Sequence, residues 1–163
     1  MKVRIAGVKK HSLVDGPGVR YAIFFQGCEH ACKGCHNPDT WDPKGGCEAD
    51  TEALAESILN DKYIDGVTIS GGDPFLQPGA LKELLERLEQ KVNVWVYTGF
   101  TFEQVWFAHR NSKRYPLHLI DVLVDGKFEE SRKGNDLYRG SSNQRLIDVK
   151  ASLSRGGAVL WQN

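Results

Sequence analysis

Three of the four cysteines in the chain lie within eight residues of one another, in the segment 24–41 that reads FFQGCEHACKGCHNPDTW. Cys28, Cys32 and Cys35 are separated by three and two residues, so one short loop can bring their thiols together. Thiolates are soft ligands, and such a set suits zinc or an iron–sulfur cluster. The pattern therefore indicates a metal centre, with unliganded core cysteines as the structural alternative.

The number of cysteines helps to decide between the two kinds of centre. Structural zinc takes four closed ligands, and here the fourth would have to be His36, adjacent to Cys35, or the distant Cys47. A cubane cluster held by three cysteines leaves one iron free to bind a substrate. We therefore favour a 4Fe-4S cluster on Cys28, Cys32 and Cys35 over zinc, and expect Cys47 to stand apart.

Composition predicts one ordinary globular domain over residues 1–163, with 40% apolar and 26% charged residues. Lysine plus arginine equals aspartate plus glutamate at 21 each, so no net field would recruit nucleic acid or an anionic membrane. The sequence shows no signal-peptide core and no run of about 18 apolar residues. We therefore expect a cytoplasmic protein that binds neither nucleic acid nor membrane and keeps its cysteines reduced.

Apolar, β-branched runs predict the strands that position the cysteine segment. We expect strands at 19–25, 66–70, 92–98, 119–126, 144–149 and 158–161. Helical patterns lie between the first of these, at 51–61, 78–91 and 101–111. Asp50 or Thr51 suits the N-cap of the first helix, and Pro78 suits the first turn of the second.

The alternation of strands and helices predicts parallel βαβ units. The short connection before the last predicted strand instead favours an antiparallel pair. About six strands supply only part of an eight-unit barrel. We therefore predict an α/β fold, an incomplete (β/α) barrel that is mostly parallel, with an antiparallel C-terminal strand and a site at the carboxyl ends of the strands.

A second motif follows one strand after the cysteines. The segment TISGGDPF (68–75) ends a predicted strand with Gly71, Gly72 and Asp73. Glycines allow the backbone to approach a ligand closely, and a carboxylate can accept a hydrogen bond from an ammonium group. Alone, such a segment is typical of a turn. Together with the Cys-x3-Cys-x2-Cys spacing, it resembles the radical S-adenosylmethionine (SAM) superfamily.

This resemblance implies a 4Fe-4S cluster on the three cysteines, with the open iron chelated by the amino and carboxylate groups of the methionine part of SAM. It implies that the glycine–glycine–aspartate motif docks that methionine part. The residue before the third cysteine is usually aromatic in the superfamily, whereas here it is Gly34. We expect the backbone around Gly34, Cys35 and His36 to contact the adenosine instead.

Further segments resemble the activating enzymes of glycyl-radical enzymes. These segments are VDGPGVR (14–20), CHNPDTW (35–41), WVYTGFT (95–101), DVLVDGKFEE (121–130) and RGSSNQRLID (139–148). The resemblance implies reductive cleavage of SAM to a 5′-deoxyadenosyl radical, which takes hydrogen from a glycine of a partner enzyme. It implies an anaerobic ribonucleoside-triphosphate reductase as that partner, with pyruvate formate-lyase as the alternative, and reduced flavodoxin or ferredoxin as the electron donor.

A zinc-stabilised binding module without catalysis is the alternative from another functional class. Tyr97 is more typical of a core than of a site, and Asp125 suits either a turn cap or a site. The remaining histidines show no paired spacing, so we expect them at the surface or at helix ends. They are His11, His30, His109 and His118.

Overall fold

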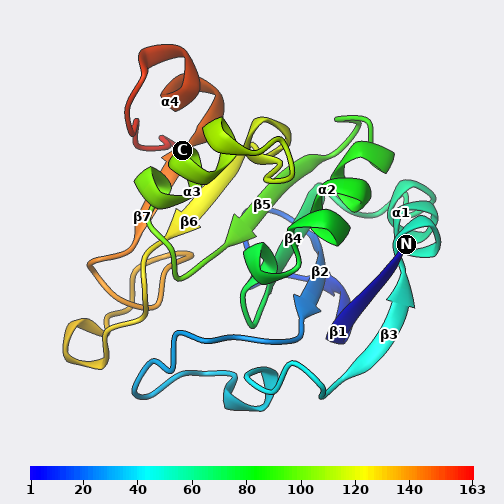
Figure 1. The fold of residues 1–163 in the computed structure, drawn as a ribbon, viewed down its shortest axis with the longest axis horizontal. Coiled ribbons are helices and arrows are strands. Elements are labelled where there is room, and N and C mark those ends of the chain that lie inside the picture. The colour runs from blue at the N-terminus through cyan, green and yellow to red at the C-terminus, as the bar shows by residue number, and fades with distance from the viewer.

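The computed structural model describes all 163 residues, which form one seven-stranded sheet and four α-helices (Figure 1). The strands are β1 (Lys2–Ser12), β2 (Arg20–Phe25), β3 (Cys47–Asp50), β4 (Gly66–Gly71), β5 (Asn93–Tyr97), β6 (Val122–Asp125) and β7 (Arg145–Asp148). The helices are α1 (Thr51–Leu59), α2 (Pro78–Arg87), α3 (Phe102–Asn111) and α4 (Val149–Arg155). No helix is both long enough and apolar enough to cross a membrane.

The sheet is mixed, with the strand order β3-β1-β2-β4-β5-β6-β7. Strands β2, β4, β5 and β6 run parallel to one another. Strand β1 is antiparallel to both β2 and β3, and β7 is antiparallel to β6. Three of the six neighbouring pairs are thus antiparallel. The prediction of about six, mostly parallel strands is therefore wrong in detail, and the barrel is not confirmed. An antiparallel strand does lie near the C-terminus, but it is β7 paired with β6, whereas the prediction placed it at 158–161 beside 144–149.

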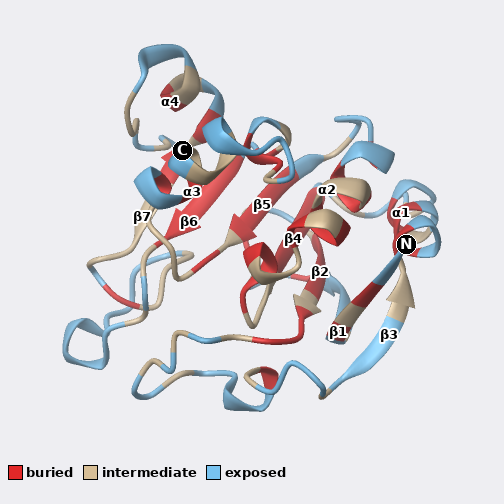
Figure 2. Ribbon diagram, viewed as in Figure 1, coloured by how far each residue is buried: buried red, intermediate tan, exposed pale blue.

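The helices pack on one face of the sheet. Successive side chains of a strand point to opposite faces, so every second residue of each strand packs against the helices. Ile23, Ile69 and Val96 belong to the large core beneath the helices, and Figure 2 shows these strands as the most buried part of the fold. On the opposite face a smaller cluster surrounds Trp95 and is covered by Trp161, near the end of the chain. The two faces therefore have different covers, helices on one and irregular chain on the other.

The predicted helix starts are confirmed. The Asp50 carboxylate accepts hydrogen bonds from the first backbone N–H groups of α1, and Pro78 opens α2. Sequence patterns did not predict α4, which replaces the expected hairpin connection. Asp148 caps its first turn and Gly156 ends it in a left-handed conformation with φ 82°. As a result, the strand predicted at 158–161 is reduced to an isolated bridge.

Strands β1 and β3 were not predicted either. Only Val3 and Ile5 of β1 combine an apolar side chain with full burial, and the four residues of β3 are half-buried or exposed. Backbone pairing between the two, from Lys2 opposite Asp50 to Ile5 opposite Cys47, makes them strands. Side-chain patterns do not record that kind of pairing.

The carboxylate of Asp125 joins the end of β6 to two other elements. Its Oδ2 atom accepts a hydrogen bond of 2.7 Å from the backbone N–H of Phe102, at the start of α3. The Arg145 guanidinium of β7 donates to the same carboxylate, with Nη2 2.5 Å from Oδ2, and also pairs with Glu103. These two carboxylates raise the pKa of Arg145, and the hydrogen bond that Arg145 donates to Asp125 is the larger cause. Asp125 therefore has a structural role that caps α3 and joins two strands.

We expect Asp125→Ala to lower the free energy of unfolding of the metal-free protein by roughly 3 kcal/mol, because buried donors lose their partner. Urea denaturation followed by circular dichroism measures this change. As a control, Glu86→Ala removes an exposed i,i+4 pair with Lys82 and should change the free energy by less than about 1 kcal/mol. Equal effects of the two substitutions would contradict the structural role of Asp125.

Candidate functional site

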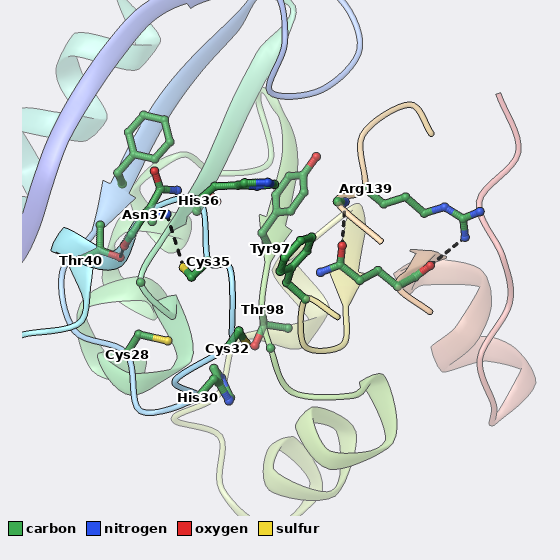
Figure 3. A pocket seen from close by; sticks show the side chains of 18 of the residues that line it. Cys28, His30, Cys32, Cys35, His36, Asn37, Thr40, Tyr97, Thr98 and Arg139 are labelled. Carbon is green, nitrogen blue, oxygen red and sulfur yellow. Dashed lines mark hydrogen bonds between the residues drawn. The ribbon is translucent and has the colours of Figure 1, made fainter. Parts of the chain in front are cut away.

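A cavity of about 570 Å³ opens at the carboxyl ends of the four parallel strands (Figure 3). Its wall includes Phe24 of β2, Gly71 of β4, Tyr97 of β5 and Gly126 after β6. Two long segments complete it: residues 26–46 between β2 and β3, which we call the cysteine loop, and residues 126–144 between β6 and β7. The carboxyl ends of parallel strands are where α/β folds place their ligands.

All three cysteines of the signature line this cavity and are half-buried. Figure 3 shows them on the same loop. The backbone N–H of Asn37 donates to Cys35 Sγ over 3.4 Å, and the N–H of Cys35 donates to the Cys32 carbonyl over 3.2 Å. Cys47 is exposed on β3 and does not line the cavity. The structure thus brings together the three thiols that spacing predicted and keeps the fourth apart.

The Cys28 thiol is affected by its burial in the protein. Burial raises the pKa of Cys28, while a hydrogen bond from the backbone N–H of His30 opposes the shift. The backbone N–H of Asn37 is the donor that lies closest to a sulfur atom of the signature, that of Cys35. Such donors stabilise a thiolate more than a thiol, because they favour the charged form. The net shift at Cys28 is upward, so burial outweighs the His30 donor and favours the thiol in the metal-free chain.

The base of the cysteine loop is joined to the end of β4 by backbone hydrogen bonds. The N–H of Gly72 donates to the Phe25 carbonyl and that of Asp73 donates to the Gly27 carbonyl, each over 2.8 Å. A Cβ atom at Gly72 would lie 2.2 Å from the Gly27 oxygen, and one at Gly71, where φ is 100°, would lie 2.4 Å from the Phe25 oxygen. Both glycines are needed for this close approach, and both also line the cavity.

The Asp73 side chain lies behind this edge, fully buried, and does not line the cavity. Its carboxylate accepts hydrogen bonds from Thr98 Oγ1 at 2.8 Å, the Gly99 N–H at 2.9 Å and the Phe75 N–H at 3.0 Å. His30 Nε2 lies 2.5 Å from Oδ2. The sequence predicted that the Asp73 carboxylate would face a ligand. In the structure, this carboxylate is surrounded by hydrogen-bond donors of the protein itself.

His30 was expected at the surface, and that expectation is wrong. Its side chain is only 8% exposed, and its ring contacts Phe100 edge-on at 4.6 Å between centroids. The spacing of histidines carries no signal for this contact, because the partner carboxylate lies 43 positions away in the sequence. The one available signal was its place between two cysteines of the signature.

A buried arginine supports the cavity from the face of the sheet opposite the helices. Arg20 donates to the Val67 carbonyl at 2.8 Å and to Thr68 Oγ1 at 3.1 Å, and Thr68 Oγ1 donates to the Asp15 carbonyl in the Asp-Gly-Pro-Gly turn. Burial lowers the pKa of Arg20 to about 10, so the guanidinium remains charged at neutral pH. Arg20 thereby fixes a turn whose residue Asp15 lines the cavity.

Comparison with known proteins agrees with this geometry. Residues 14–147 match a family described as a 4Fe-4S single cluster domain. The chain is 37% identical over 142 residues to the anaerobic ribonucleoside-triphosphate reductase-activating protein of Enterobacteria phage T4, covering 82% of this chain and 86% of that protein. Against the protein of the same name from Escherichia coli K12, identity is 37% over 145 residues, covering 81% and 90%. The chain belongs to this family of activating proteins.

A further relative is the pyruvate formate-lyase-activating enzyme of Clostridium pasteurianum. It is 33% identical over 163 residues, which cover 97% of this chain and 66% of that enzyme. The family relationship therefore includes relatives named for two different partners.

Of the residues predicted to lie beside the adenosine, Cys35 and His36 line the cavity and Gly34 does not. His36 lines the cavity and lies 4.9 Å from the Phe128 ring, between centroids. Gly34 is exposed, does not line the cavity, and faces Glu130, with a Cβ at Gly34 only 3.0 Å from its carboxyl carbon. Phe128, which sequence reasoning did not select, contributes an aromatic ring to the wall. Tyr97 is also part of the wall, and its hydroxyl donates to the Tyr138 carbonyl at 2.6 Å.

We expect Gly72→Ala to separate the cysteine loop from β4, because the added methyl group would meet the Gly27 carbonyl. Overpacking of this kind typically lowers stability by about 1–3 kcal/mol, which thermal unfolding of the metal-free protein measures. Gly157→Ala is the matched control, since a Cβ there meets nothing within 4 Å. A Gly72→Ala protein as stable as the Gly157→Ala protein would contradict the close approach.

Proposed function

We propose that the protein is a radical SAM enzyme that generates a glycyl radical on an anaerobic ribonucleoside-triphosphate reductase. The observation that carries this proposal is the opening of three thiols of one loop into the same cavity as the Gly71–Gly72 edge of β4. Membership in a family of activating proteins with a 4Fe-4S domain supports it.

The donor set fits a 4Fe-4S cluster held by Cys28, Cys32 and Cys35. No three cysteine, histidine, aspartate or glutamate side chains of the chain surround one point closely enough to hold a single metal ion. Structural zinc requires four ligands around one ion, so the zinc module fits poorly. In a cubane cluster each thiolate binds a different iron, so the sulfur atoms need not converge on one point.

We assign the SAM site to the rest of the cavity. The backbone of Gly71 and Gly72, which lines the cavity, would receive the methionine part, with Asp73 holding this edge from behind. The cavity wall around Cys35 and His36 would border the adenosine, whereas Gly34 lies outside this wall. When bound, a reduced 4Fe-4S cluster supplies the electron that cleaves SAM to methionine and a 5′-deoxyadenosyl radical.

The protein's own part is to bind, orient and shield. Rigid backbone contacts fix the cysteine loop against β4, and the 126–144 segment covers one side of the cavity. A radical formed there must meet the partner before solvent, so a wall that excludes water favours the transfer. The hydrogen atom leaves a glycine Cα of the reductase and becomes the new C–H bond of 5′-deoxyadenosine. Reduced flavodoxin or ferredoxin is proposed as the external electron donor.

The cysteine assignment predicts different results for the four thiols. Cys28→Ala, Cys32→Ala and Cys35→Ala should each abolish cluster binding, whereas Cys47→Ala should retain about four irons per chain after anaerobic reconstitution. Iron, sulfide and zinc analysis of the purified proteins measures this. Loss of iron in Cys47→Ala, or one zinc per wild-type chain without iron, would refute the three-cysteine cluster.

The partner assignment predicts direct hydrogen transfer. With reductase labelled by α-deuterated glycine, one deuterium should appear in the 5′-deoxyadenosine, together with a glycyl radical signal in electron paramagnetic resonance. Pyruvate formate-lyase assayed in parallel serves as the competing partner, because one relative carries that name. SAM cleavage without deuterium in the product and without a radical on the reductase would exclude this partner.

A further inference from the structure

The His30 imidazole connects the two motifs that border the cavity. It extends from the cysteine loop, and its Nε2 atom lies 2.5 Å from Asp73 Oδ2 behind the end of β4. Because an ionised carboxylate only accepts hydrogen bonds, Nε2 carries the proton and donates it. The side chains are 8% and 0% exposed, so the contact is shielded from water. A hydrogen bond to a charged group in such a place is among the stronger ones.

The structure provides a specific receptor for this ring. A Cβ atom at Gly99 would lie 2.5 Å from the His30 ring, so the imidazole occupies space that any other residue at 99 would fill. Phe100 contacts the ring edge-on, at 4.6 Å between centroids. The Gly99 N–H and the Thr98 hydroxyl donate to the same carboxylate as His30 does. The segment 98–100 thus holds both members of the pair.

The contact also holds the cysteine loop in an unfavourable conformation. Ala31, directly after His30, has φ 51°, in the left-handed region that residues with a side chain rarely adopt. His30 stands between Cys28 and Cys32, two residues from each of them along the loop. An anchor at His30 therefore restrains both neighbouring thiols.

We infer that His30 is a positioning residue, which fixes Cys28 and Cys32 by binding Asp73, and that Asp73 acts on the cavity through His30 instead of contacting SAM directly. The inference rests on the proposed function only in taking these thiols as cluster ligands. The order of the loop is a property of the metal-free chain and can be measured there.

The test is the rate at which iodoacetamide alkylates each cysteine of the reduced, metal-free protein, read peptide by peptide in a mass spectrometer. His30→Leu keeps the bulk of the ring and removes the donor, so Cys28 and Cys32 should react about tenfold faster, as expected for loss of one hydrogen bond to a charged group. His30→Gln, whose amide can still reach Asp73, should restore most of the protection. Cys47, on β3, should react at the wild-type rate in every variant.

Two further variants show whether faster alkylation comes from loss of the His30–Asp73 hydrogen bond or from a general loosening of the protein structure. Asp73→Asn should accelerate the same two cysteines, and His30→Leu/Asp73→Asn should be no faster than either single variant, because both break one interaction. His11→Leu is the matched control, since His11 Nε2 binds Asp61 over 2.8 Å in a similar pair at the surface. His30→Asn, whose amide stops short of Asp73, replaces His30→Leu if that protein does not fold.

The SAM affinity of the reconstituted proteins is the second measurement, and it can contradict the inference. If Asp73 contacts SAM directly, Asp73→Asn weakens SAM binding while the cysteine rates in both variants stay within twofold of wild type, and the inference is overturned. It is also overturned if His30→Gln reacts as fast as His30→Leu. A wild-type protein that binds no iron would refute the proposed function and would leave the alkylation result intact.

Discussion

The site depends on one close approach of backbone, where the ends of β2 and β4 meet. The Gly72 and Asp73 N–H groups donate to the carbonyls of Phe25 and Gly27, and glycine is required because a side chain at 72 would meet the opposite carbonyl. Main-chain hydrogen bonds of this kind leave little freedom to either segment. They fix the point at which the cysteine loop leaves the sheet, and they place the Asp73 carboxylate where segment 98–100 can bind it.

The packing of the sheet explains why this cavity lies at the carboxyl ends of the strands. The face opposite the helices is filled by Trp95 and the charged Arg20, whose guanidinium carbon lies 5.8 Å from the Trp95 ring centroid. Trp161 and Tyr138 cover this face from the C-terminal segment and the 126–144 segment. A buried arginine without a direct carboxylate partner is held by carbonyl and hydroxyl oxygens, which also fix the turn at Asp15. The cavity therefore begins where these side chains end, at the carboxyl ends of the strands.

The sequence predicted the parts of the structure that depend on local signals. Spacing placed Cys28, Cys32 and Cys35 on one loop, and apolar runs predicted the four parallel strands and three helices, because burial on both faces leaves a continuous pattern. It did not predict β3, which is a strand only through its pairing with β1. Nor did it predict the direction of the Asp73 side chain or the burial of His30, because both follow from a contact between segments far apart in the chain. The sequence therefore predicted which side chains could do chemistry, whereas the direction in which each points could be seen only in the folded structure.

The two long segments that border the cavity are held by different kinds of interaction. Backbone bonds join the base of the cysteine loop to β4, and its centre is held by the buried His30. The 126–144 segment meets that loop through the His36–Phe128 ring contact and through the exposed Lys33–Glu130 ion pair at 3.9 Å. An exposed ion pair at this separation adds little stability. We therefore expect the wall that holds the cysteines to stay fixed and the 126–144 wall to yield first. A partner protein that must reach the interior of the cavity would enter from that side.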